Sequence, residues 1–198
     1  TPAATKINRA ASGSKAWKTR LAGNYNDNQS AYLYSPCYDI STMTNATLSF
    51  SLALDLEDCG AFFCDGAYME YSVDGRTWTR LGASGQGTNW YNKAYTGNNC
   101  WSVQNYHRWH VATIPLSVIT EPISQLTQLR FRFVVNSDPA VNREGVAIDD
   151  IHIYSNPNGI YDGATMGSPV NASIPGGTGW VDFISGGKLV ASVNSPVS

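Results

Sequence analysis

The chain has 198 residues, of which 14% are charged and 12% aromatic, and its formal net charge is −2. Many glycine and aromatic residues with few charges are typical of an extracellular β-protein rather than of a helical cytosolic enzyme. Lysines and arginines are scattered singly, which argues against a nucleic-acid partner. No apolar run approaches the roughly 20 residues needed to cross a bilayer, so we expect no membrane span.

The first half of the chain predicts four strands, the last of which follows Trp78 and ends at Leu81. Residues 31–34 form a short strand that ends before Pro36, which has no N–H to donate to a neighbouring strand. Apolar and polar residues alternate over residues 47–57, the pattern of a strand with one buried face. Residues 68–73 alternate again, and Asp74-Gly75 predicts a hairpin turn because glycine accepts a positive φ.

The second half continues the same pattern. Strands are predicted at residues 109–115, 129–135 and 146–154, with one helical turn at residues 116–119. Helical periodicity extends nowhere else, and turns rich in Gly, Pro and Asn separate the short strands. The fold class is therefore predicted to be all-β, a β-sandwich.

The composition shifts at residues 155–159, where a linker is expected. We predict one domain over residues 1–155, and over residues 156–198 the linker and the beginning of a second, truncated β-sandwich with strands at 179–184 and 188–193. At about 40 residues this tail is too small to bury a core comfortably by itself. It could also pack on the first domain or complete a neighbour's sheet. Because the chain starts at Thr1 without a methionine or leader, we expect a processed or excised fragment of a secreted protein.

Two acidic groups suggest a metal site. The first, around the end of the long strand, is Asp55, Glu57, Asp58 and Asp65, and the second, in the last strand, is Asp149 and Asp150. If the two strands are neighbours, the groups could converge, and crowded carboxylates would repel one another without a cation. We therefore predict a structural calcium ion bound by these six residues, with Asn24 as a further oxygen donor. Because neighbouring side chains on a strand point to opposite faces, only one of the last two aspartates would face the ion. The alternative is a solvated acidic loop and an aspartate pair that caps turns.

The four cysteines allow three disulfide pairings, and the sequence does not choose among them. Cys59 and Cys64 bracket a short loop that could close as a local disulfide. Cys37 and Cys100 would then pair with each other or stay free.

An aromatic stretch offers a candidate ligand-binding surface. Its rings include Trp90, Tyr91, Tyr95 and Trp101, which could stack on the apolar faces of sugars. The alternative is that these rings fill the core and edges of the sandwich, as large rings usually do.

Catalysis finds little support in the sequence. It contains no GxSxG elbow and no HExxH metal motif. Asp55 and Glu57 lie on one strand face, which invites comparison with the paired carboxylates of glycosidases, but nothing in the sequence indicates a raised pKa. We therefore predict a protein that is not an enzyme.

Several short segments taken together resemble a known family. They are residues 31–36, 48–50, 65–67, 70–72, 74–78, 129–133 and 145–151. In this order they resemble the MAM-like, concanavalin-type jelly-roll modules of secreted surface proteins from Bacteroidota, over roughly residues 10–154. The resemblance implies a jelly-roll β-sandwich of two antiparallel sheets, a non-catalytic role in adhesion or glycan binding, and in several relatives a structural calcium ion. MAM domains proper carry a different cysteine pattern.

The predicted function is thus a secreted or cell-surface binding module, stabilised by calcium, whose partner is a glycan or a neighbouring surface protein. One alternative is a structural unit of a surface fibre, able to self-associate into a larger assembly and binding no small ligand. Another is an accessory domain of a secreted protease or glycosidase.

Overall fold

The computed structural model describes residues 6–95 and 97–155, together with the backbone of two strands further along. The strands before residue 156 are β1 (Trp17–Lys18), β2 (Ser30–Tyr34), β3 (Ala46–Asp55), β4 (Gly66–Ser72), β5 (Thr79–Arg80), β6 (Lys93–Tyr95), β7 (Asn98–Cys100), β8 (Tyr106–Pro115), β9 (Arg130–Asn136) and β10 (Gly145–Ser155). Two 3-10 turns, Leu116–Val118 and Ile123–Gln125, are the helical segments in this part of the chain. No helix of the described residues has the length and apolar character needed to span a membrane.

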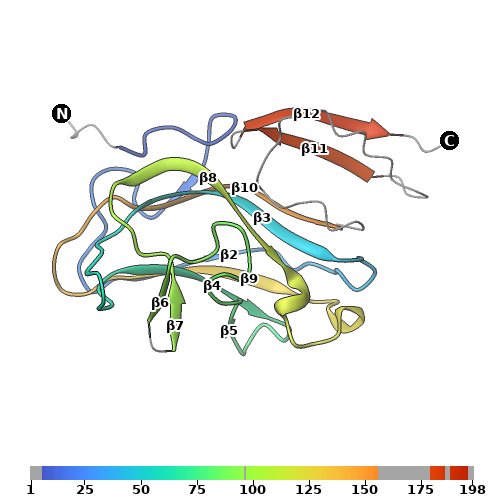
Figure 1. Ribbon diagram of the computed structural model, residues 1–198, viewed down its shortest axis with the longest axis horizontal. Helices are drawn as coiled ribbons and strands as arrows, with labels where there is room; N and C mark the ends of the chain where they lie inside the picture. Colours follow the sequence, from blue (N-terminus) through green and yellow to red (C-terminus); the bar gives the residue numbers. More distant parts are fainter. Residues whose placement is uncertain (1–5, 96, 156–178, 186–187, 196–198) are drawn as a thin grey trace.

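Two four-stranded antiparallel sheets pack together as a β-sandwich (Figure 1). One sheet has the order β1-β10-β3-β8 and the other β2-β9-β4-β5, while β6 and β7 form a separate hairpin. Successive long strands belong to opposite sheets, so that the chain crosses the core repeatedly. This architecture confirms the predicted all-β sandwich fold.

The predicted strands of the second half are confirmed with small changes at their ends. β8, β9 and β10 contain most of the residues predicted as strands, and the first 3-10 turn lies where one helical turn was expected. In the tail, β11 (Gly179–Ser185) and β12 (Lys188–Ser195) contain the two predicted strands, and they pair with each other. Ser155, the first residue of the expected linker, still belongs to β10, the other linker residues lie outside the described part of the chain, and the second sandwich stays a prediction.

The core is organised around Phe50 of β3. Its ring makes edge contacts with Phe133 of the opposite sheet, at 4.9 Å between ring centroids, and with Trp90 at 5.7 Å and Trp101 at 5.8 Å. Leu48, Leu52 and the other apolar residues of alternate β3 positions belong to the same buried cluster. The alternation in β3 therefore predicted correctly which face of the strand meets the opposite sheet.

The other face of β3 differs from the expectation of a solvated surface. All ten residues of the strand are buried, including Ser49 and Ser51. The N-terminal segment runs along the outer side of this sheet (Figure 1), and there Ile7 packs with Ala53 and Ala147 in a second buried cluster. The polar residues at alternate positions of β3 predicted a face exposed to solvent. In the structure, a segment distant in the chain covers this face.

Candidate metal centre

Three carboxylates meet at one end of the sandwich. Glu57 follows β3, Asp65 immediately precedes β4, and Asp138 follows β9. Each offers an oxygen within 4.8 Å of the oxygens of the other two. Asp65 and Asp138 meet because the antiparallel pairing of β4 with β9 sets Gly66 opposite Asn136. The site is thus built by strand register rather than by one contiguous loop.

A buried tyrosine holds the centre of this group in place. The Tyr25 hydroxyl donates a hydrogen bond to Asp65 Oδ2 and accepts one from the Glu57 backbone N–H at 3.2 Å. The Asp138 N–H donates to the other oxygen, Asp65 Oδ1, at 2.9 Å. Asp65 is completely buried, whereas Glu57 and Asp138 are half-buried. The group therefore has a fixed inner carboxylate and two outer carboxylates that remain partly accessible.

The three carboxylates of this group repel one another when they are ionised. Burial, followed by the nearby charges of Asp138 and Asp65, raises the pKa of Glu57, and the Arg143 guanidinium only partly opposes this. Burial also raises the pKa of Asp65, with a further contribution from Asp138, although hydrogen bonds from Tyr25 and Asp138 oppose it. Arg143 is the cation beside the group, but its Nε is buried without a hydrogen-bond partner. A hard cation bound among the three oxygens would relieve this repulsion.

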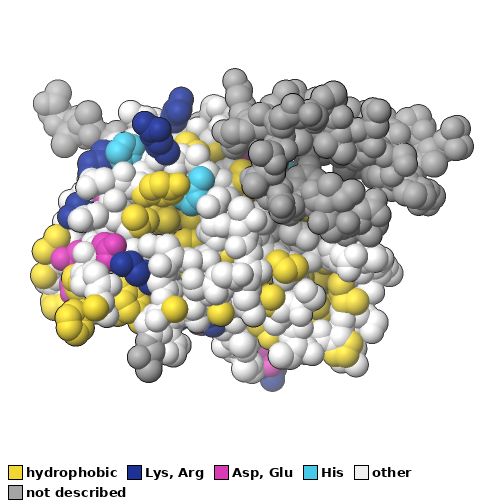
Figure 2. Space-filling view, in the orientation of Figure 1, with side chains coloured by type: hydrophobic (Ala, Val, Ile, Leu, Met, Phe, Trp, Pro, Cys, Tyr) yellow, Lys and Arg dark blue, Asp and Glu magenta, His cyan; other side chains and the backbone are white. Residues whose placement is uncertain are grey.

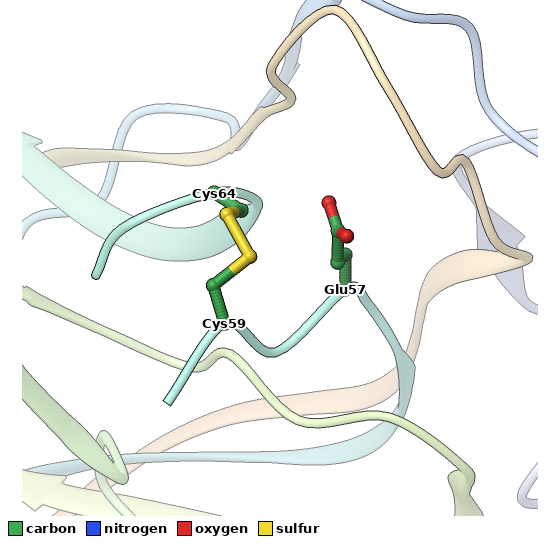
Figure 3. A group of neighbouring side chains, drawn as sticks. All are labelled: Glu57, Cys59 and Cys64. Atoms are coloured by element: carbon green, nitrogen blue, oxygen red, sulfur yellow. A yellow bond between two sulfur atoms is a disulfide. The ribbon is translucent and has the colours of Figure 1, made fainter. Parts of the chain in front are cut away.

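The segment between Glu57 and Asp65 is closed by the Cys59–Cys64 disulfide, as predicted, with the two Cα atoms 5.9 Å apart. Figure 3 shows Glu57 beside the bonded sulfur atoms. Because each sulfur is bonded to the other, neither is a thiolate ligand, and the group offers oxygen donors. Among the described residues, Cys37 and Cys100 are free, which answers the question of their pairing.

Two of the predicted ligands at this end of the molecule are neutralised by lysines instead. Asp55 forms an ion pair with Lys6, at 3.0 Å from Nζ to Oδ2, and accepts the Asn105 N–H at 2.8 Å. Asp58 forms an ion pair with Lys93, at 2.8 Å from Nζ to Oδ1. Acidic and basic side chains lie side by side at this end of the face drawn in Figure 2. Neither Asp55 nor Asp58 belongs to the carboxylate group.

The prediction that Asp149 and Asp150 join the first acidic group is wrong. β10 does pair with β3, but Asp149 lies opposite Ser51, whereas Asp55 lies opposite Gly145. The Asp149 carboxylate accepts the N–H groups of residues 11 and 12, at 3.0 Å and 3.3 Å, and Asp150 accepts the Ser12 and Ser51 hydroxyls. These two aspartates anchor the N-terminal segment on the sheet.

The side chain of Asn24, the further predicted oxygen donor, contacts Asn142 instead. It is exposed, and its amide donates to the Asn142 carbonyl at 2.8 Å. The sequence analysis missed Asp138, which belongs to the group, and Tyr25, which forms a hydrogen bond with Asp65. Each stands alone in a loop, and only the antiparallel pairing of strands 129–135 and 68–73 could have indicated Asp138.

The aromatic stretch does not form the predicted sugar-binding platform. Trp90, Tyr91 and Trp101 are 2%, 4% and 2% exposed and pack on one another in the core. Tyr95 is half-buried and makes an edge contact with Phe63. The three buried rings cannot stack on a ligand, so the alternative weighed for them, packing in the core, is correct.

Comparison with models of known protein families found no match. Comparison with curated proteins likewise found none. The resemblance to MAM-like modules therefore stays a prediction.

Proposed function

We propose that this chain is a non-catalytic binding module of a secreted or cell-surface protein, stabilised by calcium bound among Glu57, Asp65 and Asp138. The observation that carries the proposal is the convergence of these three carboxylates, from three separate segments, around a buried aspartate. Calcium binds six to eight oxygens, so water and backbone carbonyls would complete the shell. The ion would join the end of β3 to the loops at β4 and β9, and so fix the loop end of both sheets.

The environment of Asp65 supports a structural rather than a catalytic use of this group. Asp65 is completely buried, and both of its oxygens accept hydrogen bonds within the protein. A catalytic carboxylate must come within hydrogen-bond distance of its substrate. Asp65 could therefore not act as the partner of Glu57 in the paired-carboxylate chemistry of glycosidases.

Thermal unfolding with and without calcium tests the ion. After verified removal of metal by a chelator, we expect the melting temperature to fall by several degrees. An ion at 100 times its dissociation constant stabilises the native state by about 2.7 kcal/mol. The variant Asp138→Asn should lose most of this calcium response, whereas Asp39→Asn, which alters an exposed turn aspartate, should keep it. A melting temperature that does not respond to calcium would contradict the proposal.

The alternative of a structural unit without a small ligand shares the same fold and the same ion. It predicts self-association of the purified chain and no binding to glycans. Sedimentation of the full chain with and without calcium distinguishes this alternative, because the binding module should remain a monomer at low concentration.

A further inference from the structure

The outer face of the sheet β2-β9-β4-β5 carries exposed aromatic rings and arginines. In β9, Phe131, Phe133 and Val135 belong to the core, so Arg130 and Arg132 point to the opposite, outer side. Tyr34 of β2 lies opposite Arg132, and Tyr32 lies opposite Val134. Tyr34 is 56% exposed and Tyr32 is 49% exposed. In Figure 1 this face is the outer side of the lower layer, away from the other sheet.

The rings on this face are held in a fixed arrangement. Tyr32 and Tyr34 stack with 6.2 Å between centroids and an interplanar angle of 27°, and Trp78 meets the edge of Tyr34 at 5.5 Å. The Arg132 guanidinium lies 4.4 Å from the centroid of Trp78 and 4.9 Å from that of Tyr32. Its Nε donates to Glu70 at 2.6 Å. A ligand would therefore meet rings that are already ordered, and its binding would cost little side-chain entropy.

The face is positively charged although the chain as a whole is not. Arg80, Arg130 and Arg132 contribute three positive charges and Glu70 one negative charge, a net charge of +2, whereas the whole chain carries −2. Arg130 is exposed, and the ion pairs of the described residues do not include it. Its guanidinium is thus available to an anionic ligand beside the rings.

We propose that this face, made up of Tyr32, Tyr34, Trp78, Arg80, Arg130 and Arg132, binds an acidic polysaccharide whose sugars carry carboxylates, that is, a uronic-acid glycan. The exposed rings would stack on the sugar faces, and Arg130 would pair with a carboxylate, which guanidinium groups bind in a bidentate manner.

The low density of positive charge on this face favours a uronic-acid glycan as the ligand. The face has few cations, no lysine on its four strands, and aromatic rings between the arginines. A ligand with about one negative charge per ring fits this spacing better than a densely sulfated chain, which would need a stronger basic field. The proposal rests on the binding role given above, but it requires no calcium.

Affinity electrophoresis of the full chain tests this assignment, with polygalacturonate, dextran sulfate or neutral dextran in the gel and no added calcium, which would cross-link polygalacturonate. We expect retardation by polygalacturonate and little by the other two polymers. Tyr34→Ala and Arg130→Gln should each weaken the apparent affinity about tenfold, the typical effect of losing one charged hydrogen bond or one ring contact. Both side chains are exposed, so both variants should fold, and their melting temperatures verify it.

Tyr106→Ala and Arg108→Gln are matched controls, because both residues are exposed on β8 of the other sheet. They should bind as the unaltered chain does. The proposal is overturned by absent retardation in polygalacturonate, by equal or stronger retardation in either other polymer, or by Tyr34→Ala and Arg130→Gln behaving like the controls. A purely structural role of the arginine–ring contacts predicts that last result. The calcium response of the melting temperature is measured without glycan, so the two proposals fail separately.

Discussion

At the scale of single residues, the environment of Asp65 disfavours its ionised carboxylate unless a cation or a proton neutralises the charge. It is completely buried, the Tyr25 hydroxyl and the Asp138 N–H bond its oxygens, and two further carboxylates lie beside it. Burial is the main cause of its raised pKa. The residue thus links metal binding to pH.

This link predicts a pH dependence in the calcium-free protein. Because the folded-state pKa of Asp65 lies above 3.8, the native state binds more protons than the unfolded chain in the pH range above that value. Stability from this group is therefore lost as the pH rises. In chelator, the unaltered chain should gain stability relative to Asp65→Asn as the pH is lowered from neutral toward the ordinary pKa of an aspartate.

The comparison with the variant is needed because another group acts in the opposite direction. Burial lowers the pKa of His110, so its protonation destabilises the fold as the pH falls. Melting temperatures of both proteins at several pH values check the prediction. It fails if the unaltered chain and Asp65→Asn show parallel pH profiles.

At the scale of elements, the closed loop between β3 and β4 sets the distance between two of the carboxylates. The disulfide joins residues 59 and 64, directly between Glu57 and Asp65. Without it, the loop could sample many conformations in which Glu57 points away from Asp65. The disulfide should therefore support both the stability and the calcium affinity of the protein.

Replacing both cysteines by serine, Cys59→Ser with Cys64→Ser, should lower the free energy of unfolding by about 2 kcal/mol, as expected for a loop this short. It should also reduce the calcium-induced rise in melting temperature. Calcium titrations followed by thermal unfolding measure both effects. Cys37→Ser removes an exposed free cysteine and is the control. An unchanged calcium response in the double variant would show that the loop is held without its disulfide.

At the scale of the whole molecule, the N-terminal segment acts as a third layer over one sheet. Glu144 accepts the Ile7 N–H at 2.9 Å and the Lys18 ammonium at 2.8 Å, and the Lys18 and Glu144 side chains are each only 8% exposed. Asp149 binds the same segment further along. These contacts explain why β3 is buried on both faces.

Glu144→Ala should lower the free energy of unfolding by about 3 kcal/mol, because it leaves the buried Lys18 ammonium without its countercharge and with the Ile7 carbonyl, at 3.3 Å, as its remaining acceptor. Urea unfolding monitored by tryptophan fluorescence measures the change. The double variant Lys18→Met with Glu144→Gln removes both charges of this pair, so we expect it to recover more than half of the loss. An effect of Glu144→Ala no larger than that of Asp39→Ala, at an exposed turn, would contradict this role of the segment.

The sequence by itself determined the elements and favoured one covalent link. Alternation placed the long strands and the inward-facing residues of β3, because a strand has a period of two whatever its partner is. The short spacing of Cys59 and Cys64 indicated their disulfide, since loop closure is a local property.

Only the tertiary structure decided which residues from different strands meet. Strand register brought Asp138 to Asp65 and took Asp149 away from Asp55, although β10 and β3 are neighbours as expected. Sheet packing buried Trp90 and left Tyr34 exposed, two aromatic residues that composition does not distinguish. Pairing register and burial depend on contacts between segments that are distant in the chain, and a local pattern carries no information about such contacts.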